Sequence, residues 1–368
     1  MPNEFVQQLA QSAQLNDDEI AVLTAAGVRS AEDVDSLLSS FPSLANIGVR
    51  LPDISNIVSQ NLNQSYASLA ASGEMEVQEL VLGAVPPDDT EYALDAEAPS
   101  ADAANAAAIA GVAPAASDID LRLADWPVRN QGGRGTCVAF GSTACVEHMC
   151  ASSEGSITDL SEQFLYRAIK TDSGDPIKDQ DGTWLQYARD MLRTEGICTE
   201  ALWPYVDTAV NPVSGQTDTD PTQDAYNDGG NRELTAATCV RNPSNAAATV
   251  CQLLHQNNRP VAACFAVFRD PTMPTGSHGW ATKVAWSYGR ILNPPPTSVV
   301  AGGHCVCITG YVADANEPLG GYFIFRNSWG PDWAKLAPSA GVTYSPEQGY
   351  GEISASYVNK YCWELMQL

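Results

Sequence analysis

Apolar side chains recur at helical spacing through the first sixty residues of the chain. They fall three or four positions apart, as expected for helices that each bury one face. Ser30 precedes Asp33 by three residues, which resembles a capping box at the start of the third helix. The apolar positions that carry this pattern are Phe5, Leu9, Ile20, Leu23, Val34, Leu37, Leu38, Ile54, Ile57, Val58 and Leu62. We predict a small all-helical N-terminal domain over residues 1–82.

Residues 83–117 have a different composition, rich in alanine, proline and acidic groups and poor in apolar patterning. Such a segment buries too little surface to offset the entropy of ordering the chain. We therefore predict a mobile linker between the helical domain and the rest of the protein.

Short apolar runs alternate with turns from residue 118 to the end of the chain. A strong helix is predicted after Cys137, and an Asp-rich stretch at 207–232 is predicted to form an exposed loop. The apolar runs that predict strands lie at 261–268, 305–312 and 322–326. A helical first half and a strand-rich second half indicate an α+β domain over residues 118–368.

The formal net charge of −25 argues against one class of partner. Nucleic-acid binding needs clustered Lys and Arg, and residues 1–120 carry only Arg29 and Arg50 as basic groups. The stretch LTAAGVRSAEDVDSLL loosely resembles a helix-hairpin-helix module. Such modules often bind DNA, but basic groups are nearly absent here. We therefore favour a protein partner for residues 1–82 over DNA.

The sequence carries no segment that predicts export or membrane insertion. No run of about 18 apolar residues is present, and the N-terminus lacks the three parts of a secretory signal. The ten cysteines do not form the short-spaced framework of a small secreted protein. We expect a reducing, cytoplasmic location, and export by a route without a recognisable signal stays open.

The segment NQGGRGTCVAFG, residues 130–141, places a cysteine directly after a glycine-rich turn. Phe140 and Ala144 follow at helical spacing, so Cys137 is predicted to begin an amphipathic helix. A thiol there lies near unpaired backbone N–H groups and the positive end of the helix dipole, which favour the thiolate. Gln131 lies across the turn, so its amide and the Cys137 N–H are predicted to stabilise an oxyanion. A buried structural cysteine is the alternative interpretation.

A nucleophilic thiol needs a partner that accepts and returns a proton, and the chain has four histidines to supply it. His148 lies on the helix that Cys137 begins, about 16 Å further along at ~1.5 Å per residue. His255 follows a helix-like run and is predicted to lie on the surface. His304 follows two glycines and opens an apolar strand, which favours a rigid side chain facing a cleft. His278, in the loop TGSHGW, is the main rival.

The segment RNSWG, residues 326–330, follows the predicted strand at 322–326. The side-chain oxygen of Asn327 can accept a hydrogen bond from the imidazole of His304 and fix its orientation. Trp329 can cover that bond and exclude water. An Asn-Ser turn with a buried tryptophan is the structural alternative.

These motifs resemble the papain family of cysteine peptidases, especially its bacterial branch. The resemblance covers about residues 118–362 and rests on the segments NQGGRGTCVAF, LSEQ, GGHCVCITGY and NSWG. It implies a two-subdomain fold, with a helical part and a strand-rich barrel-like part on either side of the active-site cleft. It also implies catalytic roles for Cys137, His304, Asn327 and Gln131, and substrate contacts from Gly135, Gly303 and Trp329.

Two positions depart from the family pattern. Arg134 stands where secreted members carry a disulfide cysteine, and Val138 stands where many carry tryptophan. The first departure agrees with a reducing compartment, and the second changes packing but removes no catalytic group.

Two clusters invite a metal interpretation, and neither supports one. Cys305 and Cys307 share one face of the predicted strand while His304 takes the other, so buried small side chains are favoured over zinc. The aspartates of the 207–232 stretch lack the central glycine and the terminal glutamate of a helix-loop-helix calcium site; they are Asp218, Asp220, Asp224 and Asp228. We expect neither a metal nor a cofactor.

The motifs together predict a cysteine-type endopeptidase that acts on protein or peptide substrates through a thioester intermediate. A non-catalytic papain-like scaffold and an amine acyltransferase are the alternatives. For residues 1–117 two roles stay open: a pro-region of a zymogen that occupies the cleft, or a module that docks the peptidase to a partner.

Overall fold

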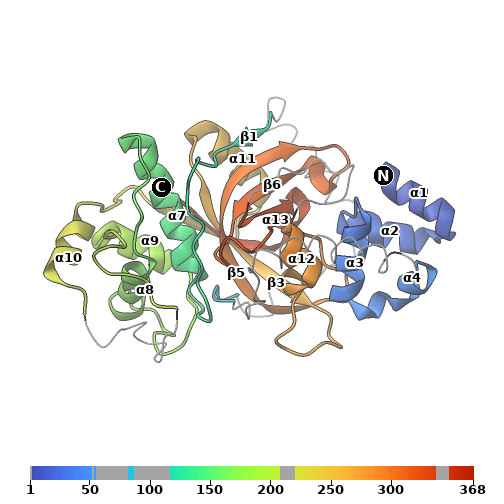
Figure 1. Cartoon of the computed structure of the whole chain (residues 1–368), viewed down its shortest axis with the longest axis horizontal. Coiled ribbons are helices and arrows are strands. Elements are labelled where there is room, and N and C mark those ends of the chain that lie inside the picture. Colours follow the sequence, from blue (N-terminus) through green and yellow to red (C-terminus); the bar gives the residue numbers. More distant parts are fainter. Residues whose placement is uncertain (1, 52–53, 55–81, 87–116, 208–219, 337–347) are drawn as a thin grey trace, which may run out of the picture.

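We analysed a computed structural model of the chain. It describes residues 2–51, 54, 82–86, 117–207, 220–336 and 348–368. A mostly antiparallel sheet lies in the middle of the molecule (Figure 1), with one group of helices on its left and the N-terminal helices on its right.

The N-terminal helices begin at well-defined caps. Asn16 forms a complete capping box with Glu19 at the start of the second helix. At the third helix only half of the predicted box forms: the Ser30 hydroxyl accepts the Asp33 N–H, but the Asp33 carboxylate accepts from the Arg29 N–H instead. The elements are α1 (Glu4–Ala13), α2 (Asp17–Ala26), α3 (Ala31–Ser40), η1 (Pro42–Leu44) and α4 (Ala45–Arg50). The predicted helical positions Ile57, Val58 and Leu62 lie outside the described residues.

The left-hand helices form the helical subdomain, which consists of α7 (Cys137–Glu154), α8 (Glu162–Thr171), α9 (Leu185–Thr194) and α10 (Gln223–Gly230). The prediction of an exposed loop over 207–232 is wrong for its second half, because α10 begins there at the N-cap Thr222. Ala225 of this helix is buried against Phe164 and Trp203, and this packing overrides the polar local sequence. Residues 208–219 lie outside the described part.

The strand subdomain is built on a sheet of order β2-β8-β3-β5-β6-β7-β4, with β1 paired to β5. All pairs are antiparallel except β4 with β7. Its strands are β1 (Ile119–Asp120), β2 (Thr238–Arg241), β3 (Val261–Arg269), β4 (Arg290–Ile291), β5 (Val299–Ala313), β6 (Gly321–Arg326), β7 (Tyr350–Ser354) and β8 (Cys362–Gln367). Its helices are α11 (Ala246–Asn257), η3 (Gly279–Ala281), α12 (Lys283–Tyr288), η4 (Pro318–Gly320) and α13 (Ala355–Tyr361).

The three predicted strands exist, but β5 begins at Val299 rather than near residue 305. His304 therefore lies inside a long strand and not at its start. His304 pairs with Phe265 of β3, and the residues before and after it pair with β3 as well. Strand pairing therefore holds its backbone in place.

The first helix of the body, α7, is buried from Cys137 through His148 rather than amphipathic. It packs directly on β5, and Gly141 permits the close approach. A Cβ atom at Gly141 would lie 3.0 Å from the Cys305 sulfur and 3.3 Å from the Val306 carbonyl carbon. This packing brings the first residue of α7 next to the middle of β5.

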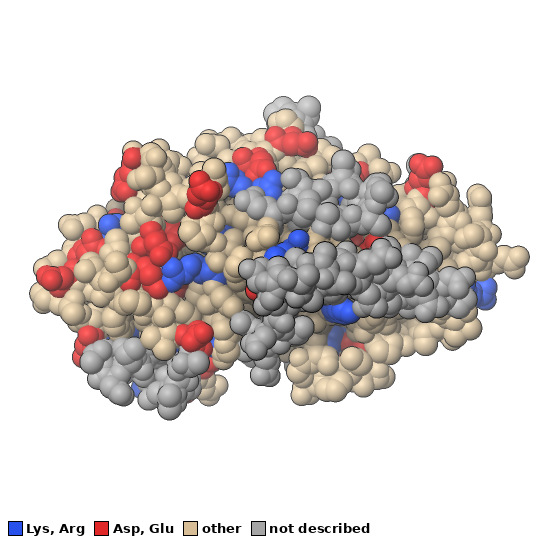
Figure 2. Space-filling view, in the orientation of Figure 1, with Lys and Arg blue, Asp and Glu red and all other residues tan. Residues whose placement is uncertain are grey.

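Acidic side chains gather over the helical subdomain on the face drawn in Figure 2. Among the described residues, none of the helices is both long and apolar enough to cross a bilayer.

The close contact at Gly141 gives a stability prediction. Gly141→Leu inserts a side chain between α7 and β5, and overpacking of this kind costs about 1–3 kcal/mol of unfolding free energy. Urea denaturation measures it. Gly133→Ala is the control, because a Cβ there meets nothing within 4 Å. Equal midpoints for the two variants would contradict the close packing.

Candidate active site

Two loops from different subdomains clasp each other at one end of α7. The Gln131 N–H donates to the Ser328 carbonyl at 2.8 Å, and the Gly330 N–H donates to the Arg129 carbonyl at 3.1 Å. Asn130 and Trp329 form an antiparallel bridge between them. The glycine-rich turn before Cys137 is thus fixed against the loop that carries Asn327.

His304 and Asn327 are in direct contact. The His304 Nε2 lies 2.8 Å from the Asn327 Oδ1, which also accepts the Ser328 N–H at 2.8 Å. An amide oxygen only accepts, so Nε2 carries the proton and Nδ1 is left as the free lone pair. Within the described part of the chain, Nδ1 has no hydrogen-bond partner although it is buried.

Aromatic rings enclose the imidazole. Trp329 stacks on His304 with ring centroids 4.4 Å apart and planes 24° from parallel. Trp280 of η3 meets the same imidazole edge-on at 5.5 Å. The two indoles exclude water from the His304–Asn327 bond, as the sequence predicts for Trp329.

The Cys137 sulfur lies against the backbone of β5. The N–H of Cys305, the residue after His304, is 3.4 Å from that sulfur. The side chain of Cys305 lies on the face of β5 opposite to that of His304 and points toward Gly141 of α7. The thiol thus lies against the residue that follows His304, and the imidazole contacts the amide predicted from the third motif, where α7, β5 and the loop after β6 converge.

Gln131 is fully buried beside them. Its Oε1 accepts the Ser328 hydroxyl at 2.6 Å, and its Nε2 donates to the Arg134 carbonyl at 2.7 Å.

A short segment, which the sequence places at the end of the helical domain and the start of the linker, lies between the two subdomains instead. Residues 82–86 pass between the two subdomains, and Ala84 bridges Thr183 on one side and Gly303 on the other. The Gly83 and Ala84 N–H groups donate to the Gly303 carbonyl at 3.2 and 3.0 Å, and Val85 and Gly83 exchange backbone bonds with Thr183. We name residues 82–86 the cleft strand; residues 87–116 lie outside the described part.

The cleft strand passes close to the predicted substrate-binding glycines. A Cβ at Gly83 would lie 2.2 Å from the Gly135 carbonyl carbon, and one at Gly303 would lie 2.4 Å from the Ala84 oxygen. Gly83 and Gly135 permit the close approach of the cleft strand to the turn before α7, and Gly303 permits its close approach to β5. Sequence reasoning missed this strand because a run such as LGAVP shows no periodicity; its glycine was the sole local signal.

Burial sets the protonation of the pair. Cys137 is fully buried, and the loss of water raises the pKa of its thiol, with Cys305 adding to the effect. Burial also lowers the pKa of His304 to about 3, against the opposing hydrogen bond to Asn327. The closed site therefore holds a neutral thiol and a neutral imidazole, where the sequence predicts a thiolate.

Of the other three histidines, two stand apart from this arrangement. His148 packs against Trp126, and His255 is exposed and bonds to the Ser117 carbonyl. His278 lies closer, with its ring 6.2 Å from that of Trp329. The contact with Asn327 belongs to His304.

No cluster of metal ligands occurs in the described residues. Cys305 and Cys307 are fully buried, and the Cys307 sulfur lies 3.6 Å from that of Cys145 on α7. Asp228 of the acidic stretch pairs with Arg232 at 2.7 Å, whereas Asp218 lies outside the described part.

Comparison with known proteins agrees with this geometry. The model of the papain family of cysteine proteases matches residues 115–337, which is more than half of the chain. The chain belongs to the papain family. The predicted family and the predicted α+β fold with preceding helices are both confirmed.

The individual relatives are distant. The chain is 25% identical to cathepsin J of Rattus norvegicus over 208 residues, which cover 56% of this chain and 54% of cathepsin J. It is 30% identical to cathepsin B-like CP3 of Giardia intestinalis over 211 residues, which cover 56% and 61% of the two chains. The chain thus spans about half the length of the curated relatives it matches.

Among solved structures, Xylellain, a cysteine protease from Xylella fastidiosa, has a TM-score of 0.53 and 20% identity. The alignment covers 80% of this chain and 97% of Xylellain. At this identity the likeness shows the fold alone.

Arg134 shows how this papain-family chain fills the position of the missing disulfide cysteine. Its guanidinium lies between the rings of Tyr166 and Tyr205, 5.3 and 5.0 Å from their centroids. It also donates to Gln163 at 2.7 Å and to the Val206 carbonyl at 2.6 Å. A buried cation thus ties the glycine-rich turn to the helical subdomain without a covalent bond.

The wall that pairs with the cleft strand rests on a buried ion pair. Lys170 donates to Asp175 at 2.7 Å, with both side chains fully buried, and also to the Gly182 carbonyl. Asp175 accepts the Thr183 hydroxyl at 2.9 Å. The pair therefore holds the backbone of Thr183 in place.

Lys170→Met should destabilise the protein strongly, because it leaves the Asp175 carboxylate buried without a cation. Loss of one partner of a buried pair costs about 3–5 kcal/mol of unfolding free energy. Urea denaturation checks this against Lys178→Met. Lys178 pairs with Asp179 on the surface, where its side chain is 59% exposed, so that variant should change stability by about 0.5 kcal/mol or less. A Lys170→Met loss as small as the control's would contradict the anchoring role.

Proposed function

We propose that this protein is a cysteine-type endopeptidase that hydrolyses peptide bonds through Cys137, His304 and Asn327. The observation that supports this proposal is the contact between His304 and Asn327. His304 lies on β5, and the N–H of the following residue, Cys305, lies against the Cys137 sulfur. A nucleophile, a base and a group that orients the base are the three parts that acyl transfer by a thiol requires.

The chemistry follows from the tautomer. The Nδ1 lone pair of His304 accepts the Cys137 proton, which generates a thiolate and an imidazolium. The thiolate attacks the scissile carbonyl, and the imidazolium then protonates the leaving amine. Water hydrolyses the thioester with the same imidazole as base, while Asn327 holds the ring through Nε2.

We assign stabilisation of the oxyanion to Gln131 and the Cys137 N–H. The Cys137 N–H is at the first turn of α7, where backbone donors have no helical acceptor. The second donor is the Gln131 amide, which lies at the start of the glycine-rich turn before α7. Loss of one such donor lowers the rate about 10²–10³-fold in acyl-transfer enzymes.

The cleft strand supports a zymogen-like form of this peptidase. The Gly83 and Ala84 N–H groups of the strand interact with the Cys137 sulfur. The strand therefore lies over the proposed nucleophile and blocks the approach of a substrate peptide.

Dehydration adds to this inhibition. The thiol and the imidazole are both fully buried, and the cleft strand lies against the thiol. Transfer of a proton between them creates two charges that burial disfavours. Removal of the strand readmits water and restores the conditions for an ion pair. Of the two roles open for residues 1–117, the inhibitory one is assigned here to residues 82–86.

Gly83→Val in the full chain tests this assignment. A side chain at Gly83 overlaps the Gly135 backbone, so the strand should leave the cleft. We expect alkylation of Cys137 by iodoacetamide near neutral pH to become at least about tenfold faster, with peptidase activity rising alongside. Peptide mapping by mass spectrometry separates Cys137 from the nine other cysteines.

Pro86→Ala is the matched control on the same strand, and Cys137→Ala removes the reactive site. Equal labelling of Gly83→Val and the unaltered chain would refute inhibition by the strand. Rapid labelling without cleavage of a peptide library would indicate the scaffold instead, and amide transfer to an added amine would indicate an acyltransferase.

The pH dependence of alkylation should differ between the two forms. In the unaltered chain, burial raises the pKa of Cys137 and lowers that of His304 to about 3, so both groups are neutral across the physiological range. Labelling should then increase only as the solution becomes alkaline. In Gly83→Val the rate should already be high below neutral pH, because the ion pair forms there. Identical pH profiles for the unaltered chain and Gly83→Val would contradict inhibition by dehydration.

A further inference from the structure

The N-terminal helices and the cleft strand occupy opposite sides of the strand subdomain (Figure 1). The strand lies between the sheet and the helical subdomain, whereas α1–α4 lie beyond the far end of the sheet, against α12 and η3. Helices in that position cannot obstruct the cleft directly. Their role must be sought in what they contact.

A cluster of buried charges joins the helices to the body. Arg290 of β4 donates to Asp33 at 3.1 Å and to the Gly27 carbonyl at 2.6 Å, both in the N-terminal part. On its own side it pairs with Glu317 at 2.8 Å and Glu352 at 2.9 Å. Burial disfavours its charge, but the three carboxylates together raise the pKa of Arg290 and keep it a cation.

Arg29 completes this cluster from the N-terminal side. Its Nη2 lies 2.6 Å from Glu352, and its Nε lies 2.9 Å from Glu317 as an ion pair not aligned as a hydrogen bond. The Arg29 side chain is 9% exposed, and those of Glu317 and Glu352 are 0% and 1% exposed. We call Arg29, Asp33, Arg290, Glu317 and Glu352 the anchor cluster. Each part of the chain satisfies buried charges of the other, so separation leaves both incomplete.

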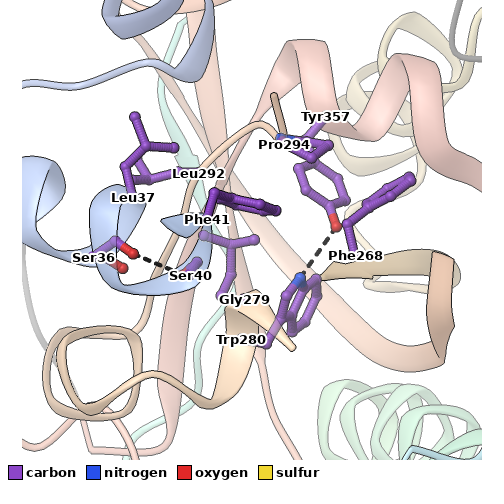
Figure 3. A pocket seen from close by; sticks show the side chains of 11 residues that line it. Ser36, Leu37, Ser40, Phe41, Phe268, Gly279, Trp280, Leu292, Pro294 and Tyr357 are labelled. Carbon is purple, nitrogen blue, oxygen red and sulfur yellow. Dashed lines mark hydrogen bonds between the residues drawn. The ribbon is translucent and has the colours of Figure 1, made fainter. Parts of the chain in front are cut away.

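Backbone bonds and apolar packing extend the contact. Asn293 donates to the Ala25 carbonyl at 2.8 Å, and the Ser43 N–H donates to the Asp270 carboxylate at 2.8 Å. Leu37 and Phe41 face Trp280 and Tyr357 across a small pocket (Figure 3). The apolar core of α1–α4 is continuous with that of the body. Apolar contacts of this kind are typical of permanent interfaces.

The same contact reaches the candidate active site through one residue. Phe41 and Ser40 lie against Gly279, and the next residue, Trp280, packs edge-on against His304. The Trp280 Nε1 donates to the Tyr357 hydroxyl at 3.2 Å, which donates on to the Ala266 carbonyl at 2.7 Å. The N-terminal helices therefore support the residue that holds the imidazole.

We infer that α1–α4 are a permanent part of the peptidase body, and that activation releases only the cleft strand. Only the second part of this inference, the release of the cleft strand on activation, rests on the proposed function. The helices stay docked through the anchor cluster and keep Trp280 against His304. They act as a positioning element and not as an inhibitor.

The test uses the full chain with a site for a specific endopeptidase inserted within residues 55–81 and another within 87–116. After both cuts, size-exclusion chromatography should show the helical fragment co-eluting with the body, and activity should appear. Separation of the helical fragment from the otherwise unaltered cut chain overturns the inference, whatever the activity.

Arg29→Gln removes one member of the anchor cluster. In the cut chain it should weaken retention of the helical fragment about 100-fold or more. Activity should then fall on dilution and recover on concentration; a rise on dilution would mean that the helices inhibit. Arg50→Gln is the matched control, because Arg50 pairs with Glu19 inside the helical part and its side chain is 44% exposed. It should match the unaltered cut chain.

Two readouts separate failure of the inference from failure of the proposed function. Retention of the helical fragment requires no catalysis. A cut chain that retains the fragment but neither hydrolyses peptides nor reacts with iodoacetamide at Cys137 refutes the peptidase assignment and the positioning role, and leaves only the docked interface.

Discussion

The candidate active site depends on how closely α7 approaches β5. Cys137 begins the helix and His304 lies within the strand, so their separation is set by helix-to-strand packing and not by any local turn. Gly141 makes the distance short enough, since a side chain there would meet the Cys305 sulfur. The loop clasp between residues 129–131 and 328–330 then fixes Asn327 behind the imidazole. Each remaining part of the site is placed relative to this contact.

Water content controls what the assembled groups can do. A thiol at a helix N-terminus favours the thiolate when solvent can reach it, yet the same thiol under the cleft strand favours the neutral form. The helix dipole and the burial act in opposite directions, and complete burial is the larger effect. In the proposed function, one geometry thus serves an inactive and a reactive form, which differ in whether residues 82–86 occupy the cleft.

The N-terminal part contains two elements with different contacts. The helices share an apolar core and a buried charge cluster with the body, whereas the cleft strand is held by a few backbone bonds and by the fit of glycines. Burial of charges on both sides of an interface makes separation costly. Backbone pairing of a short strand is more easily exchanged for pairing with another extended peptide. The two elements therefore suit permanent and reversible attachment respectively.

The sequence by itself determined the family, the helix that begins at Cys137 and the main strands, because periodicity and the three motifs are local signals. It did not determine the full length of β5, the helix at α10, the path of residues 82–86 or the partners of Arg29. These depend on contacts between residues far apart in the chain, such as Gly83 with Gly303 and Arg29 with Glu352. Such pairs leave no pattern in their own neighbourhoods, since a buried arginine or a strand-forming glycine is defined by what folding brings to it.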